Sequence, residues 1–286
     1  MDFSTLKKAL TFILTLSVFF VLVSNLSCTK KTPSKDNGVV FDTIQENKTQ
    51  SIDYKKSKLN CNLHISFVYP VAWNKSAPLA DLQKRFIEKV FPSLNANLSP
   101  KDAVSNFSAQ YLRDFQAIPS KDSFEDDDLL EDENNFMYEL NLENEVLYNQ
   151  NGFISFVVKN TNYEGGAHGS NSIYGYVFNI TTGKFLTEED FEKDDYKKNV
   201  ASLLAWKIAE ANGLTDVAQL ENNGYNAVDA IVPNENFTID DKGITYYFNE
   251  YEIAAYFIGI TKVFIPYEEL KPFVTSNSPV TPFIDR

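Results

Sequence analysis

The chain has 286 residues, a net charge of −13, and 23 Phe and 15 Tyr. This length allows one large or two small globular domains behind an N-terminal segment. The acidic excess disfavours nucleic acid as a ligand, because binding phosphates needs clustered Lys and Arg, and it favours basic partners. Abundant aromatic side chains are typical of sheet-rich proteins.

The N-terminus has the pattern of a secretory signal. Lys7 and Lys8 precede an apolar run from Ala9 to about Val23, and small or polar residues then lead to Cys28. Such a pattern marks a segment for export, and "NLSC" resembles a bacterial lipobox. We therefore predict a lipoprotein signal peptide over residues 1–27 and lipidation of Cys28. The alternative is an uncleaved anchor helix. Either way the remaining chain is extracytoplasmic, in the cell envelope and anchored to a bacterial membrane.

The segment after Cys28 begins "TKKTPSKDNG" and has little to bury. We predict a flexible tether over residues 28–58. Cys61 then opens the strand-like "CNLHISFVYP", in which every second side chain from Cys61 onward faces the core. We interpret Cys61 as a buried small hydrophobe rather than a nucleophile. His64 points to the opposite face, so the two do not form a metal pair, and no metal or cofactor is predicted.

Helices and strands are expected in separate runs along the rest of the chain. Apolar residues at helical spacing predict a helix over residues 79–91 and another that begins at Pro100 with Ser99 as its N-cap. The acidic run Lys121–Asn135 lacks the EF-hand glycine and late glutamate, so we predict a solvated loop. The expected strands are 136–142, 145–148, 153–159, 172–180, 237–239, 244–248 and 262–266.

A third helix is expected from about residue 196 to Asn212, after a capping box formed by Thr187 and Asp190. The segregation of helices and strands predicts an α+β fold with antiparallel sheets and helices packed on one side. We expect a two-part domain, with an N-terminal subdomain over residues 59–170, a C-terminal subdomain over 171–272 and a tail over 273–286.

The stretch "YEGGAHG" has the composition of a site. Gly165 and Gly166 can adopt positive φ, and His168 can act as a base, a metal ligand or a hydrogen-bond donor. No HExxH spacing and no G-x-S-x-G elbow occurs in the sequence. A Glu164/His168 acid–base pair is the one catalytic arrangement left. The alternative is a histidine whose ring nitrogens bond the backbone and fix the turn.

This stretch, followed by "FNITTGKFLTEEDF", "FTIDDKGITYYFNEYEIAAYFIG" and "VFIPYEEL", resembles a bacterial extracytoplasmic family. The family includes the outer region of RsiV-like anti-sigma factors, which sense lysozyme, the non-catalytic module ahead of PdaC-like peptidoglycan deacetylase domains, and free-standing lipoproteins. The resemblance covers about residues 59–270 and implies a two-part α+β fold and a binding role rather than a reaction. The matching positions are Tyr163, Gly165, Gly166, Ala167, His168, Phe248, Tyr251, Glu252 and Gly259.

The candidate binding residues are therefore Tyr163, Glu164, Gly165, Gly166, His168, Tyr251 and Glu252. We expect neither an anti-sigma segment before the apolar run nor a deacetylase domain after Leu270. The resemblance implies a lipoprotein that binds a basic protein such as lysozyme, or peptidoglycan glycans through aromatic faces such as Trp73. Trp206 is expected to belong to the core. The alternatives are an envelope hydrolase that uses Glu164 and His168, and a scaffolding lipoprotein that binds another envelope protein.

Overall fold

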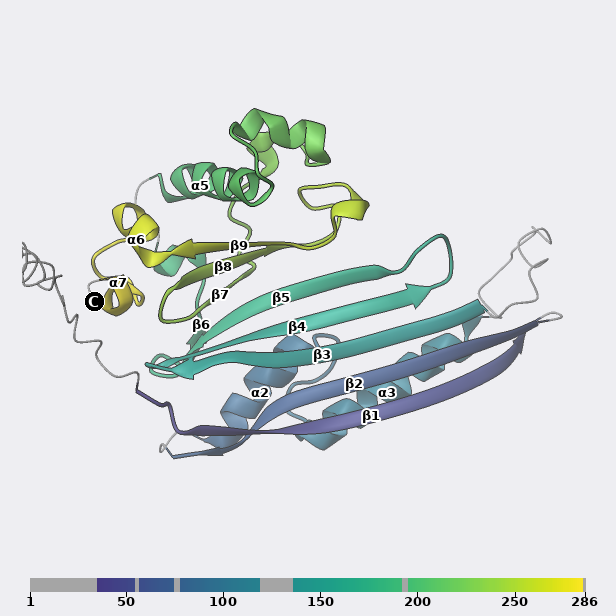
Figure 1. Ribbon diagram of the computed structural model, residues 1–286. Coiled ribbons are helices and arrows are strands. Elements are labelled where there is room, and N and C mark those ends of the chain that lie inside the picture. Colours follow the sequence, from purple (N-terminus) through teal and green to yellow (C-terminus); the bar gives the residue numbers. More distant parts are fainter. Residues whose placement is uncertain (1–34, 55–56, 75–77, 119–135, 192–194, 285–286) are drawn as a thin grey trace, which may run out of the picture. The chain divides into compact units, whose positions relative to one another are not determined.

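The computed structural model describes residues 35–54, 57–74, 78–118, 136–191 and 195–284, which belong to one compact unit. The predicted signal peptide, Cys28 and the acidic run Lys121–Asn135 lie outside these residues. The described strands form a six-stranded sheet in the order β1-β2-β3-β4-β5-β6 and a three-stranded sheet in the order β7-β8-β9 (Figure 1).

The strands of the larger sheet are β1 (Val39–Tyr54), β2 (Ser57–Trp73), β3 (Phe136–Gln150), β4 (Phe153–Glu164), β5 (Ser170–Asn179) and β6 (Lys184–Phe185). Those of the smaller sheet are β7 (Phe237–Ile239), β8 (Gly243–Phe248) and β9 (Thr261–Pro266). The α-helices are α2 (Leu79–Val90), α3 (Pro100–Gln116), α5 (Tyr196–Ala211), α6 (Tyr267–Leu270) and α7 (Thr281–Ile284). The 3₁₀ helices are η2 (Glu188–Asp190), η3 (Val217–Asn223), η4 (Val228–Ala230), η5 (Tyr256–Ile258) and η6 (Lys271–Phe273).

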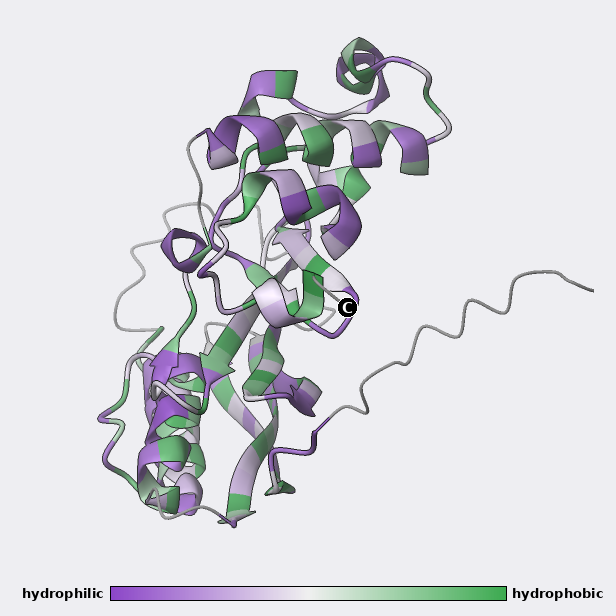
Figure 2. Ribbon diagram, turned by 90° about the vertical axis from the view of Figure 1, so that its left-hand side faces the viewer, coloured by the Kyte–Doolittle hydropathy of each residue, from purple (hydrophilic) through white to green (hydrophobic). Residues whose placement is uncertain are grey.

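The elements are stacked in layers (Figure 1). Helices α2 and α3 cover one face of the larger sheet, the smaller sheet packs on its other face, and α5 covers the outer face of the smaller sheet. Apolar and polar residues alternate along the elements (Figure 2), as expected when each buries one face. The α+β class is confirmed, although β2 and β3 pair in parallel because α2 and α3 connect them.

Several local signals act as the sequence predicts. The Ser99 side chain caps α3 by accepting a hydrogen bond from the backbone of Asp102. Thr187 and Asp190 form the capping box, which here starts the short helix η2. Asn151 and Gly152 make the β3–β4 hairpin turn with φ of 54° and 90°. The two strands predicted over 136–142 and 145–148 are one continuous strand, β3, with a bulge between Val146 and Tyr148.

The predicted tether is wrong for much of its length. Residues Val39–Tyr54 form β1, which pairs with β2 along its whole length. Phe41 and Ile44 pack against the core beneath α2 and α3. The strand was missed because most of its residues are polar, and because the bulge at Val40 and Phe41 breaks the alternation expected of a strand.

The predicted tail over residues 273–286 is also wrong for its described part. Val274, Val280 and Phe283 are buried in the core of the smaller sheet. The Phe283 ring stacks on Tyr267, with centroids 5.6 Å apart, and contacts Phe153 of β4 at 5.8 Å. The segment therefore joins the two sheets, although its Ser- and Pro-rich sequence has no helical or strand periodicity.

The smaller sheet is bound to an open edge of the larger one. Strand β5 pairs with β4 on one side, whereas β6 covers only its end at Phe178 and Asn179. Side chains from the second half of the chain take the place of a neighbouring strand along the rest of this edge. Their hydrogen bonds to the β5 backbone are Glu250 Oε2 with the Asn171 N–H at 2.9 Å, Asn249 Oδ1 with the Ile173 N–H at 2.7 Å, and Asn236 Oδ1 with the Gly175 N–H at 2.7 Å.

Glycine is required where the two sheets approach most closely. A Cβ atom at Gly175 would lie 2.6 Å from the carbonyl oxygen of Phe237. On the neighbouring strand, Ser155 Oγ donates to the Ile239 carbonyl at 2.6 Å and accepts from the Ile239 N–H at 3.2 Å. The domain boundary predicted between residues 170 and 171 falls at the start of β5, which is hydrogen-bonded to β4 in the larger sheet.

Replacing Asn236 by Ala should lower the free energy of unfolding by about 2–4 kcal/mol. The change removes the acceptor for the Gly175 N–H and the donor that bonds the Ile173 carbonyl at 2.9 Å, and each buried backbone group left unpaired costs about 1–3 kcal/mol. Urea unfolding measures the loss. Asn222→Ala, at an exposed site, is the control and should stay within about 0.5 kcal/mol of the parent. Equal stability of the two variants would show that the edge does not need Asn236.

Candidate functional site

The β4–β5 hairpin is a tight turn held by its own side chains. Gly165 and Gly166 have φ of 89° and 90°, a backbone conformation that other residues adopt only with strain. The Tyr163 hydroxyl donates to the Gly166 carbonyl at 2.9 Å. Tyr163 thus holds the turn, and its hydroxyl is already engaged within the hairpin.

His168 lies against two tyrosines from the loop between β8 and β9. Its ring stacks on Tyr256 at a centroid distance of 3.9 Å and an angle of 23°, and Tyr256 stacks on Tyr251 at 5.6 Å. We call His168, Tyr251 and Tyr256 the aromatic cluster. The Nδ1 atom of His168 lies 2.9 Å from the Gly169 carbonyl oxygen and its Nε2 atom lies 3.3 Å from the Tyr251 hydroxyl. An Nδ1–H that donates to the carbonyl leaves Nε2 to accept from the hydroxyl.

Tyr251 is displayed to solvent at a conformational cost. Its φ is 66° and the residue is 60% exposed. A bulky residue in the left-handed region costs about 1–3 kcal/mol, and such strain gathers at functional positions. The Tyr251 side chain offsets little of this cost by burial, so the fold alone does not explain why a tyrosine stands here.

Two carboxylates flank Tyr251 in the chain. Glu250 accepts hydrogen bonds from the backbone and side chain of Asn171 at 2.9 and 2.8 Å. Glu252 accepts from the Asn249 N–H at 2.8 Å and from the Asn234 side chain at 2.5 Å. Among the described residues neither carboxylate has a lysine, arginine or histidine within ion-pair distance. The surface around the cluster therefore carries negative charge that no cationic side chain of the described residues neutralises.

The structure brings together only some of the residues singled out from the sequence. His168 and Tyr251 meet, whereas Glu252 is used to fix the loop. Glu164 lies within electrostatic range of Tyr111 on α3, whose pKa is raised mainly by burial and then by Cys61 and Glu164. No hydrogen bond or ion pair joins Glu164 to His168, although both lie in the described part. Tyr256 was missed, because only the folded loop brings it to the hairpin.

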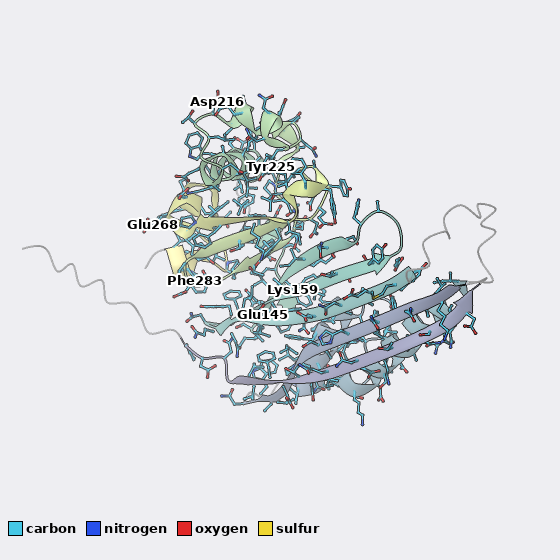
Figure 3. The ribbon with its side chains drawn as sticks, turned by 45° about the vertical axis from the view of Figure 1, so that its right-hand side comes forward. Glu145, Lys159, Asp216, Tyr225, Glu268 and Phe283 are labelled. Atoms are coloured by element: carbon cyan, nitrogen blue, oxygen red, sulfur yellow. The ribbon has the colours of Figure 1, made fainter. Side chains whose placement is uncertain are left out.

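The face of the larger sheet turned away from α2 and α3 is polar over β1–β3. Lys159 and Glu145 form an ion pair across β4 and β3 at 2.6 Å (Figure 3). His64 points to this face, as predicted, with Nδ1 2.6 Å from Asn47 Oδ1 and Nε2 3.6 Å from Glu143. Cys61 lies on the opposite face and is fully buried. Cys61 and His64 thus lie on opposite faces of the sheet.

The two tryptophans occupy different settings. Trp73 is half-buried and lines a groove of about 400 Å³ between α2 and the β5–β6 turn. Trp206, expected in the core, is 46% exposed on α5, because the buried side of that helix passes through Leu204, Ala205 and Ile208 instead.

Within the ranges that the structure describes, no group of three or more His, Cys, Asp or Glu is placed to hold a metal. Nor is any described helix long and apolar enough to cross a membrane.

Two family models match the sequence in successive segments. Residues 54–171 match the family described as deacetylase PdaC, and residues 189–268 match the family DUF3298, described as a protein of unknown function. The chain thus carries a PdaC deacetylase-like segment, which holds β2–β4 and the hairpin, ahead of a DUF3298-like segment with α5 and β7–β9. No curated protein matches the chain.

Solved structures agree with this arrangement. A member of the DUF3298 family from Bacteroides fragilis has a TM-score of 0.74 at 26% identity, over 88% of this chain and 100% of that one. A DUF3298 family protein from Pseudomonas aeruginosa has a TM-score of 0.57 at 15% identity, over 85% of this chain and 97% of that one, and shows a shared fold. The described part of the chain is thus an α+β fold whose two successive segments are similar to the PdaC and DUF3298 families.

Cys61 should be nearly inert toward alkylation in the native protein. Burial raises its pKa from 9.0 to about 11, so at pH 8 the reactive thiolate is about a hundredfold scarcer than for an ordinary thiol. Peptide mass spectrometry after iodoacetamide treatment measures the modified fraction. Labelling should be slow in buffer, rise with pH toward 11 and become rapid in urea. Fast labelling of the native protein at pH 8 would contradict the buried position.

Proposed function

We propose that the described part of the chain is a non-catalytic binding module, and that its contact surface is the aromatic cluster. The partner class best matched to this surface is a basic protein such as lysozyme. We further propose that the module acts outside the cytoplasm, in the cell envelope, tied to a bacterial membrane by a lipid on Cys28. The N-terminal sequence pattern supports this placement.

The observation that carries the proposal is the stack of His168, Tyr256 and Tyr251, whose outer rings are exposed, beside two carboxylates that pair with no cation among the described residues. Tyrosines of this kind dominate protein interfaces, because they bury a large rigid area at small conformational cost. Negative charge that the protein leaves open accelerates encounter with a basic partner. The strained backbone at Tyr251 supports the same conclusion, since the strain keeps the ring displayed.

A glycan is the second candidate ligand. The near-parallel rings of His168 and Tyr256, at 23° to one another, form a flat surface of the kind that carries apolar faces of sugars. The resemblance to the module ahead of PdaC-like peptidoglycan deacetylase domains favours peptidoglycan as the glycan to examine first. Sugar hydroxyls carry no charge, and the carboxylates of peptidoglycan peptides would be repelled by Glu250 and Glu252. Only the affinity for a basic partner should therefore fall as salt rises, which separates the two candidates.

Calorimetric titration with lysozyme should give binding that weakens several-fold between about 50 and 300 mM salt, as expected when separated charges contribute. Tyr251→Ala and Tyr256→Ala should each weaken binding by at least about tenfold, the loss expected of aromatic residues at an interface centre.

Tyr174→Ala is the matched control, because this tyrosine of β5 is 46% exposed and lies outside the aromatic cluster. Its affinity should stay within about twofold of the parent. Absence of heat at high lysozyme concentration would remove the basic-protein partner. Binding of peptidoglycan fragments that Tyr251→Ala abolishes would then establish the glycan instead.

The hydrolase alternative is tested at His168. If the module is not catalytic, the parent protein and His168→Ala should both release no more acetate or reducing ends from peptidoglycan than a control without protein. It should lower stability by at most about 1 kcal/mol, through the lost contact with Tyr256. A measurable hydrolytic rate that disappears in a stably folded His168→Ala variant would instead identify an enzyme.

A further inference from the structure

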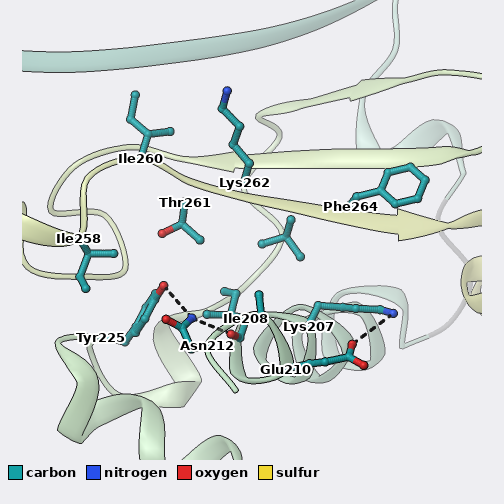
Figure 4. A pocket seen from close by; sticks show the side chains of 12 residues that line it. Lys207, Ile208, Glu210, Asn212, Tyr225, Ile258, Ile260, Thr261, Lys262 and Phe264 are labelled. Atoms are coloured by element: carbon teal, nitrogen blue, oxygen red, sulfur yellow. Dashed lines mark hydrogen bonds and ion pairs between the residues drawn. The ribbon is translucent and has the colours of Figure 1, made fainter. Parts of the chain in front are cut away.

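A groove of about 420 Å³ lies between α5 and β9, on the smaller sheet (Figure 4). Lys207 stands at one end, paired with Glu269 at 2.7 Å and near Glu210 at 3.9 Å. Asn212 stands at the other end, where its side chain bonds the Tyr225 hydroxyl at 3.3 Å. Apolar side chains line the space between, namely Ile208, Ile258, Ile260 and Val263.

The groove follows the backbone edge of β9. Five successive residues, 260–264, line it. Neighbouring residues of a strand point to opposite faces of the sheet, so a cavity lined by 261–264, four successive residues of β9, runs along the strand's edge. Strand β9 is hydrogen-bonded to β8 on one side, and the sheet has no strand beyond it among the described residues.

The register shows which backbone groups this edge offers. The Tyr247 N–H donates to the Asn236 carbonyl. The odd-numbered residues of β8 therefore direct their backbone N–H and C=O groups toward β7, and the even-numbered residues direct theirs toward β9. Tyr246 pairs with Val263, so the backbone N–H and C=O groups of Val263 face β8. Lys262 and Phe264 then direct their N–H and C=O groups outward along the groove, and no bond to these groups is found in the described part.

We propose that this edge binds an extended peptide segment of a protein partner, which adds to the smaller sheet as a fourth strand. Backbone groups of Lys262 and Phe264 would supply the main-chain hydrogen bonds, as in other cases of strand addition. This surface meets the aromatic cluster at the short helix η5, but the proposal does not depend on the function proposed for that cluster.

The two sides of the edge define the chemistry of the peptide. Toward α5, Ile208 and Val263 form an apolar floor that fits an apolar side chain. On the opposite face lies the exposed Lys262, which has no carboxylate within ion-pair distance among the described residues. Since successive residues of an added strand alternate between these sides, the fitting segment has an apolar residue next to an acidic one.

Lysines on edge strands often prevent another strand from pairing with that edge, and this is the alternative role for Lys262. Its Nζ atom lies 5.9 Å from the Tyr247 ring centroid, which places the ammonium group over the face of the sheet rather than across the open edge. Phe264 is 44% exposed on that face and lies over Gly243, where a Cβ atom would come within 2.7 Å of its ring. The backbone edge is therefore left accessible.

Selection of a random heptapeptide display library on the full chain tests the proposal, with fluorescence anisotropy of the enriched peptides as the readout. We expect sequences that alternate apolar and acidic residues. Lys262→Pro should weaken their binding at least about tenfold, because proline removes an outward N–H but no bond of the β8–β9 ladder. Lys262→Ala should cost only about two- to fivefold and only at low salt.

Lys48→Ala, on the edge strand β1 of the other sheet, is the matched control and should bind as the parent does. If Lys262→Pro fails to fold, methylating the backbone amides of the selected peptide tests the same hydrogen bonds on the unchanged protein, and a loss of at least about tenfold is expected. No enrichment, or binding that survives both Lys262→Pro and amide methylation, would overturn the proposal. Loss of binding on Tyr251→Ala alone would assign the peptides to the aromatic cluster.

Discussion

The open edge of β5 is the constraint on which the arrangement of the two sheets depends. An edge strand in the middle of a fold exposes backbone donors and acceptors that cannot be left unpaired once buried. In this protein three side chains, from Asn236, Asn249 and Glu250, occupy the place of the missing strand. The smaller sheet is consequently fixed by directional bonds as well as by burial, and Gly175 permits the close approach that those bonds require.

The same bonds position the candidate site. Asn249 and Glu250 precede Tyr251 directly, so the loop that closes the β5 edge is also the loop that presents the tyrosines to His168. The hairpin on the other side is held by Tyr163 and by the Tyr256 hydroxyl, which donates to the Gly169 carbonyl at 3.1 Å. The rings are thus displayed on a scaffold whose backbone bonds are already satisfied, and a rigid surface loses little entropy when it binds a partner.

Much of the fold could be predicted from the sequence, because its strongest signals are local. The alternation from Cys61 to Tyr69, the caps at Ser99 and Thr187, and the turn at Asn151 and Gly152 each depend on near neighbours in the chain. Strand β1 could not be found this way, since polar residues occupy both of its faces, with Glu46 opposite the buried Ile65 and Asn47 opposite His64. The burial of Val280 and Phe283 likewise depends on a surface formed by residues far away in the sequence.

The candidate site was predictable only in part for the same reason. The glycines and His168 stand out in one short stretch, and the resemblance added Tyr251. Tyr256, however, becomes a site residue only when the β8–β9 loop folds back on the hairpin, whereas Glu164 makes no bond to His168 and lies within electrostatic range of Tyr111 instead. Sequence spacing identifies which residues are unusual, whereas the sheet register decides which of them share a face.

The short helix η5 contributes to both surfaces described above. Tyr256 at its first residue belongs to the aromatic cluster, and Ile258 at its last lines the groove beside β9. A ligand that immobilises this turn at one surface reduces the conformational entropy that the turn loses when a second ligand binds at the other surface. The coupling free energy that results is reciprocal. A ligand in the groove would change the affinity of the aromatic cluster for its ligand, and a ligand on the cluster would change the affinity of the groove by the same factor. One turn of 3₁₀ helix would thereby make binding at the two proposed surfaces thermodynamically dependent on each other.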